Sequence, residues 1–136
     1  MGNRAIILFE EPKDELIPAV YLHWNGGIES IQAFCEVCKS RQYRDPAEDP
    51  SYAMARFVGV CHEFFGIGSS TSLGITTYKL GQGDAGDNGI FVIGKNWKIT
   101  RNFYDVDGKI KRGSLKNHDP ERTLAIEKYI LGRYKE

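Results

Sequence analysis

The spacing of apolar positions along the chain predicts two strands, two helices, several further strands and a final helix. Short segments rich in β-branched and aromatic residues, separated by glycine, proline and acidic turn residues, have the composition of strands. Asp107-Gly108, late in the chain, predicts a two-residue hairpin turn. The predicted strands are residues 5–10, 16–24, 73–80, 90–94 and 97–104.

Two central segments have the 3.6-residue period of amphipathic helices. The first runs from Ile28 to about Gln42, and the second covers about 51–65, after an N-cap aspartate and a proline at the first helical position. Their apolar stripes are Ile28, Ile31, Phe34, Cys35, Val37 and Cys38, and then Met54, Phe57, Val58, Cys61, Phe64 and Phe65. The sequence therefore predicts a single α+β domain over 1–136, in which a mostly antiparallel sheet has the two central helices packed on one face and a C-terminal helix.

The last predicted helix, from Asp119 to about Tyr134, carries apolar residues on two sides. Leu124 and Leu131 lie on one side, and Ile126, Tyr129 and Ile130 lie nearly opposite. Such a helix is either wedged between elements of its own chain or packed against another molecule. The second alternative predicts a homo-oligomer, which would be expected to be symmetric.

The sequence Asn25-Gly26-Gly27 separates a predicted strand from the first helix. Because Asn and Gly tolerate positive φ, this segment predicts a sharp turn. Its backbone N–H groups, at the positive end of the helix dipole, form a candidate anion site. Trp24 shares a face with Leu22 and is expected to pack in the core, whereas His23 is expected at solvent or at an interface.

Composition and charge argue against several classes of function. The chain has 18 basic and 18 acidic residues, so no overall field attracts it to DNA, RNA or an anionic membrane. An anionic ligand would have to be bound by local groups. There is no apolar run near the roughly 20 residues that cross a bilayer, and the N-terminus does not read as a secretory signal. Three cysteines, an odd number, fit a reducing compartment, so we expect a cytoplasmic protein that binds neither DNA nor a membrane.

The motifs for metal binding and catalysis are weak. Cys35, Cys38, Cys61 and His62 could supply zinc ligands, but the cysteines fall within helical apolar stripes and His62 points roughly 100° away from Cys61. Residues 105–108 (DVDG) begin like a calcium loop, but the basic residues that follow supply no further ligands. No nucleophile or paired-carboxylate motif stands near a histidine, and no phosphate-binding glycine motif opens a helix. The sequence predicts no metal, no cofactor and no enzyme.

Arg101 breaks the pattern of its predicted strand, because it shares a face with Trp97, Ile99 and Phe103. A guanidinium group on an apolar face is costly unless it is paired. One interpretation is exposure at an edge or a structural pair with an acid. The other is that Arg101 lines an anion pocket, with aromatic neighbours suited to stacking on a base.

Three stretches carry a resemblance to a known family: YLHWNGG before the first helix, YAMARFVG in the second helix, and GDNGIFVI. With the order of elements, they resemble the phage Thoeris anti-defence family over roughly residues 5–104. The resemblance implies a non-catalytic sponge that binds a glycocyclic ADP-ribose made by a TIR-domain sensor and does not cleave it. It also implies a homo-oligomer, a cyclic ADP-ribose or cyclic oligonucleotide ligand, and action in the cytoplasm of an infected bacterial host.

The candidate ligand-binding residues come from side-chain chemistry, not from an alignment to that family. Arg101 and Arg56 are candidates for phosphate groups, Asn88 for ribose or base, and Phe91 and Trp97 for stacking. The leading hypothesis is a sponge that sequesters the immune signal. The alternative is a small protein-binding inhibitor of a host defence complex, with the acidic loop GDAGDNG or the last helix as its contact. A small enzyme acting on a nucleotide signal is a third hypothesis.

Overall fold

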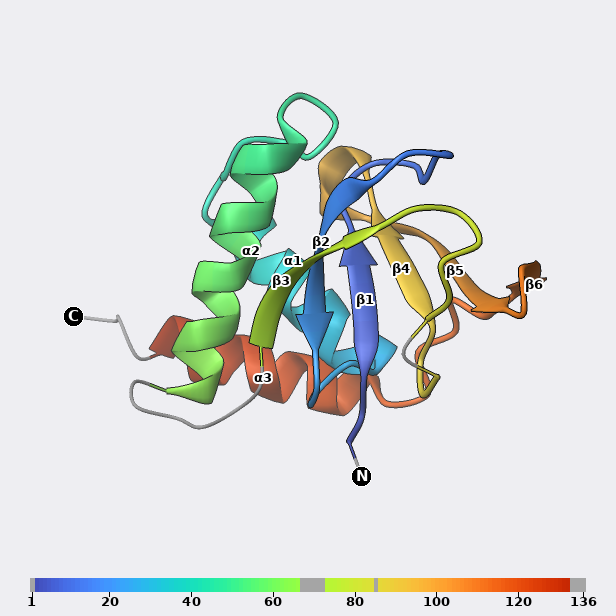
Figure 1. Cartoon of the computed structure of the whole chain (residues 1–136). Coiled ribbons are helices and arrows are strands. Elements are labelled where there is room, and N and C mark those ends of the chain that lie inside the picture. The colour runs from blue at the N-terminus through green and yellow to red at the C-terminus, as the bar shows by residue number, and fades with distance from the viewer. Residues whose placement is uncertain (1, 67–72, 85, 133–136) are drawn as a thin grey trace.

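The computed structural model describes residues 2–66, 73–84 and 86–132. Over these residues the chain forms one six-stranded sheet, three α-helices and one short 3-10 turn (Figure 1). The strands are β1 (Ala5–Leu8), β2 (Ile17–Leu22), β3 (Leu73–Tyr78), β4 (Ile90–Ile93), β5 (Ile99–Val106) and β6 (Lys109–Arg112). The helices are α1 (Ile28–Ser40), α2 (Pro50–Phe65) and α3 (Pro120–Gly132), and the 3-10 turn is η1 (Lys95–Trp97).

The strands lie in the order β3-β2-β1-β4-β5-β6. All neighbours are antiparallel except β1 and β4, which are parallel. The chain between β2 and β3 contains α1 and α2, and α3 follows the last strand. This arrangement confirms the predicted α+β fold, with a mostly antiparallel sheet and a C-terminal helix.

The helices bury one face of the sheet. Rings from α1, α2 and the end of β1 meet there: Phe34 and Phe57 have ring centroids 5.9 Å apart, and Phe9 and Phe57 have centroids 5.3 Å apart. Ile126 and Ile130 of α3 belong to the same core. The outward side of α3 exposes Leu124 (53%) and Leu131 (37%), so the helix does carry two apolar sides and buries one of them.

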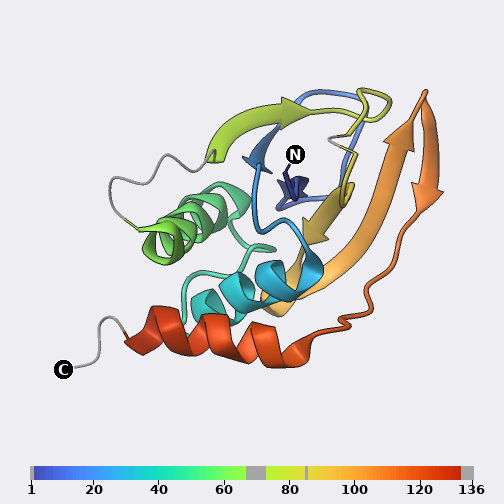
Figure 2. The same ribbon diagram turned by 90° about the horizontal axis from the view of Figure 1, so that it is seen from below.

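The other face of the sheet is buried because the sheet curls (Figure 2). Tyr78 at the end of β3 reaches Phe103 of β5, although three strands lie between β3 and β5 in the sheet order, with ring centroids 6.3 Å apart. The Tyr78 hydroxyl donates a hydrogen bond to Asp105 (2.6 Å), and the N–H groups of Gly81 and Gly83 donate to the same oxygen (3.0 Å each). These hydrogen bonds to Asp105 hold the end of β3 and the segment after it against β5, over this second core.

A β-bulge in β5 corrects the predicted face of Arg101. Val92 pairs with Arg101 but Ile93 pairs with Ile99, so Thr100 is an extra residue, and its hydroxyl donates to the Val92 carbonyl (3.3 Å). The extra residue reverses the alternation of side chains. Ile99 consequently packs with the helix-covered core, whereas Phe103 belongs to the opposite core. The prediction that Trp97, Ile99, Phe103 and Arg101 share one face was wrong because a bulge has no clear signature in the period of two.

The Asn25-Gly26-Gly27 turn forms as predicted, with φ of 59° at Asn25. A Cβ on Gly26 would lie 2.5 Å from the carbonyl oxygen of Asn3, so glycine is required by the close approach of the N-terminal segment. The Glu29 carboxylate lies beside Gly27, but no side chain caps this helix end with a hydrogen bond, and the anion site stays a prediction. Trp24 was also misplaced: its side chain is 45% exposed, since it lies beyond the end of β2.

Candidate functional site

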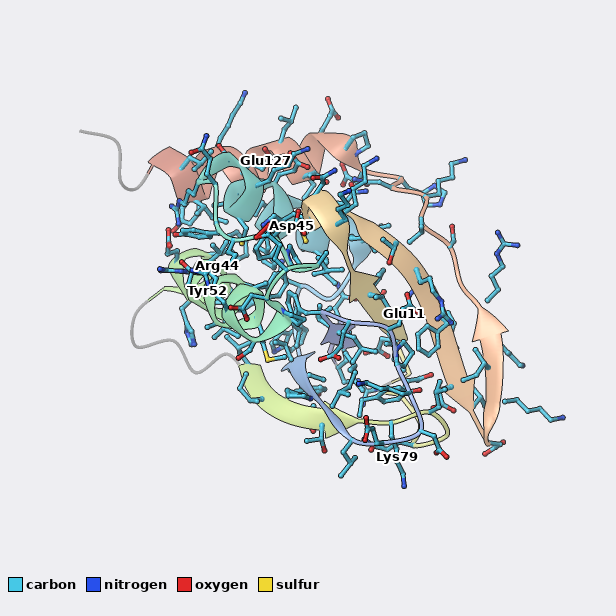
Figure 3. All side chains as sticks on the ribbon, turned by 90° about the horizontal axis from the view of Figure 1, so that it is seen from above. Glu11, Arg44, Asp45, Tyr52, Lys79 and Glu127 are labelled. Carbon is cyan, nitrogen blue, oxygen red and sulfur yellow. The ribbon has the colours of Figure 1, made fainter. Side chains whose placement is uncertain are left out.

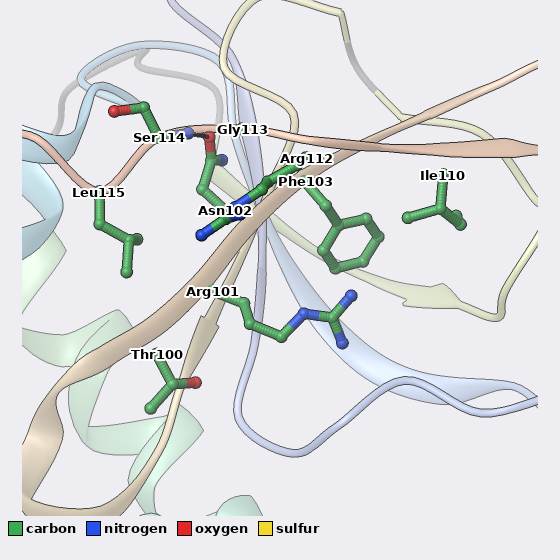
Figure 4. Close-up of a pocket in the computed structure, with 9 residues that line it drawn as sticks. All are labelled: Thr100, Arg101, Asn102, Phe103, Ile110, Arg112, Gly113, Ser114 and Leu115. Carbon is green, nitrogen blue, oxygen red and sulfur yellow. Dashed lines mark hydrogen bonds between the residues drawn. The ribbon is translucent and has the colours of Figure 1, made fainter.

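A hollow of about 630 Å³ lies along β5 and β6 (Figure 4). Its lining combines two guanidinium groups, a carboxamide, hydroxyl groups and apolar side chains. The lining residues are Thr100, Arg101, Asn102 and Phe103 of β5, Ile110 and Arg112 of β6, and Gly113, Ser114 and Leu115 after β6.

The hairpin turn determines where Arg112 lies. Asp107 and Gly108 both have positive φ (52° and 76°) and join β5 to β6 as predicted. The register that this turn sets pairs Phe103 with Arg112. Arg101, two residues before Phe103, is therefore the diagonal neighbour of Arg112 on the sheet. Diagonal neighbours are about 7–8 Å apart, close enough for long side chains to bind one small molecule.

Arg101 has two contacts. Its Nη1 donates to Glu11 Oε1 at 2.6 Å, and its guanidinium carbon lies 4.6 Å from the centre of the Phe103 ring. Figure 4 shows the Arg101 guanidinium beside that ring, whereas the Arg112 side chain extends toward Asn102. The interpretation as a pair with an acid is therefore confirmed; Arg101 also lines a hollow, and anion binding there stays a prediction.

The wall of the hollow is fixed by Asn102. Its carboxamide nitrogen donates to the carbonyls of Asn88 (2.9 Å) and Ile90 (3.1 Å), and its oxygen accepts the Ser114 N–H (3.1 Å). A Cβ on Gly113 would collide with this carboxamide, so the chain needs glycine as it leaves β6. These hydrogen bonds hold the hollow's polar side in one conformation.

The charge along β6 and the segment that follows it is entirely basic. Residues 108–118 carry four basic side chains (Lys109, Lys111, Arg112 and Lys116) and no acid. Within the described ranges, Arg112 forms no ion pair with a carboxylate, and all four side chains of β6 are exposed. A chain with no net charge thus has a locally basic edge beside the hollow.

The structure does not bring the five predicted ligand-binding residues together. Arg101 lines the hollow, but Arg56 lies on α2, with its guanidinium 4.9 Å from the ring centres of both Tyr43 and Tyr52. Asn88 donates to Asn3 Oδ1 (2.6 Å) and to the Arg4 carbonyl (3.0 Å), so its carboxamide nitrogen already ties the N-terminal segment to the loop before β4.

Phe91 and Trp97 lie in the core on the helix-covered face. Each is only 3% exposed, and the Trp97 indole N–H donates to the Tyr43 carbonyl at 3.2 Å. Rings buried in this way present no face on which a base could stack. Aromatic chemistry alone does not predict how deeply a ring is buried, and both rings lie in segments whose side chains point toward the helices.

Sequence reasoning missed Arg112, Asn102 and Glu11. A signal for Arg112 was present, since counting residues back from Asp107-Gly108 places it opposite Phe103. The run of basic residues without an acid was a second signal. Glu11 had none, because it lies 90 positions from Arg101 and meets it only through the tertiary fold.

The three cysteines are buried, as the helical stripes predicted. Burial is the main cause that raises the pKa of each thiol, to about 12 for Cys38, which disfavours the thiolate that binds metals. Among the described residues, no group of three or more His, Cys, Asp or Glu side chains is placed to hold a metal ion. His62 of α2 is exposed.

None of the helices in the described part of the chain is long and apolar enough to cross a membrane. Comparisons with models of known protein families, with curated proteins and with solved structures find no match. Fold and site together define an α+β domain with a basic hollow on the hairpin at one edge of its sheet, and the resemblance to a phage family stays a prediction.

Proposed function

We propose that the protein binds a phosphate-bearing nucleotide in the hollow along β5 and β6 and holds it without cleaving it. One observation carries this proposal: arginines from neighbouring strands line a single hollow in a protein with no net charge. Guanidinium groups make strong charge-assisted hydrogen bonds to phosphate, and two of them suit a ligand with two phosphate groups.

The shape and lining of the hollow favour a nucleotide over a simple anion. Its volume of about 630 Å³ is within the usual range for small-molecule sites, which is about 300–1,000 Å³. The Arg101 guanidinium is supported on one side by the Phe103 ring, and bases stack on guanidinium planes as they do on aromatic rings. Ser114 adds a hydroxyl group that suits a sugar.

The resemblance to the Thoeris anti-defence family suggests the ligand. Cyclic ADP-ribose carries a pyrophosphate, a sugar and a base, the groups that this lining suits. We therefore propose a sponge for a cyclic ADP-ribose-type signal, or for a related cyclic oligonucleotide, acting in the cytoplasm of an infected bacterium. Removing the signal from solution would suppress TIR-dependent immunity.

The test is to incubate the protein with cyclic ADP-ribose, separate bound from free nucleotide, and then heat-denature the protein. A sponge removes the nucleotide and returns it intact, whereas altered product would indicate an enzyme. Arg112→Ala should abolish capture, and Arg122→Ala, which removes the same charge from the exposed surface of α3, should not. Equal capture by both variants, with circular dichroism showing folded proteins, would refute the site.

A second candidate function, binding to another protein, is favoured by α3. Leu124 is 53% exposed and Leu131 37% exposed on the same side of this helix. The acidic loop is a poorer contact, because Asp87 pairs with Arg4 (2.9 Å) and Asp84 accepts two backbone N–H groups. The apolar side of α3 would also suit a homo-oligomer. Two results together would identify the helix rather than the hollow as the interaction site. The nucleotide stays free in the capture assay, and Leu124→Glu lowers the mass of the assembly that light scattering measures.

A further inference from the structure

The ion pair between Glu11 and Arg101 lies at the rim of the hollow. Arg101 lines the hollow, but Glu11 belongs to the segment between β1 and β2 and is not among the lining residues. In Figure 3, Glu11 lies on the side of the molecule formed by the sheet, away from α2 and α3. Its carboxylate thus holds the guanidinium from outside the hollow.

The pair is built on one short contact. Glu11 Oε1 accepts from Arg101 Nη1 at 2.6 Å, and within the described ranges the other Arg101 donors form no hydrogen bond. The Glu11 side chain is 61% exposed and the Arg101 side chain 42% exposed. Exposed single-contact pairs are weak and screened by salt, so this carboxylate can be displaced.

We infer that Glu11 is an internal competitor, which occupies Arg101 until the anionic group of the ligand replaces it. This inference rests on the proposed function, because it concerns the same hollow. A phosphate group carries more charge and more acceptor oxygens than a carboxylate, so it can replace Glu11 on Arg101 and still reach Arg112. The ligand must first break the internal pair, and its apparent affinity is lowered by the fraction of molecules in which the pair is closed.

The experiment measures the binding of inorganic pyrophosphate by titration calorimetry at low ionic strength, in the full chain, in three single variants and in one double variant. Glu11→Gln keeps the shape of the side chain and removes its charge, and we expect pyrophosphate to bind about two- to fivefold more tightly, the range that an exposed pair accounts for. Glu10→Gln is the matched control: it removes the same charge from the neighbouring position, whose carboxylate faces Lys13 (3.8 Å). It should change the affinity by less than about 1.5-fold.

The Arg101→Ala background distinguishes competition by Glu11 for Arg101 from simple repulsion between the Glu11 carboxylate and pyrophosphate. In that background Glu11 has no partner to release, so Glu11→Gln should leave the affinity unchanged. The gain from Glu11→Gln in the otherwise unchanged protein should also shrink as salt rises, because the competing pair is itself screened.

The outcomes distinguish the two proposals. If Arg101→Ala weakens binding but Glu11→Gln does not tighten it, or tightens it equally in both backgrounds, Glu11 is not a competitor and only this inference fails. If the unchanged protein and Glu11→Gln both fail to bind pyrophosphate, the hollow is not an anion site and both proposals fail.

Discussion

The hydrogen bond between Tyr78 and Asp105 gives a direct test of how the second core is closed. The Tyr78 side chain is fully buried, Asp105 is 2% exposed, and the hydroxyl donates to the carboxylate at 2.6 Å. Tyr78→Phe removes this donor and keeps the ring against Phe103. A hydrogen bond to a charged group contributes about 1.5–3 kcal/mol to stability, and we expect the free energy of unfolding to fall by that amount.

The expected fall in Tm follows from the size of the chain. Unfolding entropy is about 2.1 cal/mol/K per residue, so the 136 residues give about 0.29 kcal/mol/K. The loss then corresponds to a Tm lower by about 5–10 °C, measurable by calorimetry. Tyr104→Phe is the control, since its hydroxyl has no hydrogen-bond partner among the described residues, and its Tm should change by no more than about 2 °C.

The pH dependence tests the same contact independently. Burial first, and then the hydrogen bond to Asp105, raise the pKa of Tyr78 above its usual range. Above about pH 10 the unfolded chain loses this proton while the folded chain keeps it, so the protein loses up to about 1.4 kcal/mol per pH unit. Phenylalanine has no such proton, so the stability difference between the two proteins should shrink above about pH 10. A Tm within 2 °C of the unchanged protein, together with a pH-independent difference, would refute this account of the contact.

Three further predictions concern other parts of the molecule. Because burial raises the pKa of the three thiols, a thiol reagent at about pH 8 should leave the native protein unmodified and label it only in denaturant. Gly113→Ala should force the Asn102 carboxamide out of place, weakening nucleotide capture and lowering stability by about 1–3 kcal/mol in urea titration. Glu63→Gln should cost about 1–3 kcal/mol in the same titration, because Arg41 donates two hydrogen bonds to this carboxylate (2.7 and 2.8 Å) and both side chains are about one-fifth exposed.

The sequence predicted the elements whose signals are local. Asp49 accepts the Tyr52 N–H (3.1 Å) at the start of α2, and Asp107-Gly108 forms the hairpin turn, because capping and turn chemistry depend on a few adjacent residues. The helical stripes also held, since Phe34, Phe57 and Cys61 are all buried. The fold class could therefore be predicted from local signals, without contacts between residues distant in the sequence.

The candidate site depended on information that is not local. Because of the bulge at Thr100, Arg101 lies on the opposite face of the strand from Ile99. The sequence around Thr100 contains no residue that predicts a bulge there. Phe91 was assigned to stacking by its chemistry, but its depth follows from the helices that cover its face. Arg101 does lie beside Phe103, as the alternation predicted, but the bulge separates both residues from the face of Trp97 and Ile99.

The chain has no net charge, but its acidic and basic residues are concentrated in different segments, and this affects how a ligand would be bound. Four acids fall within residues 10–15, four basic residues fall within 108–118, and Glu11 pairs with Arg101 of β5, the strand next to β6. At physiological salt, exposed charges are screened beyond about one Debye length, which is about 8 Å. Long-range attraction would then add little to the rate of binding, and affinity would depend on direct contacts in the hollow. Two results would support direct contacts as the source of affinity. The association rate measured by stopped flow hardly depends on salt, and Arg112→Ala loses capture. A rate that falls steeply with salt would mean that the basic edge attracts ligands despite its acidic neighbour.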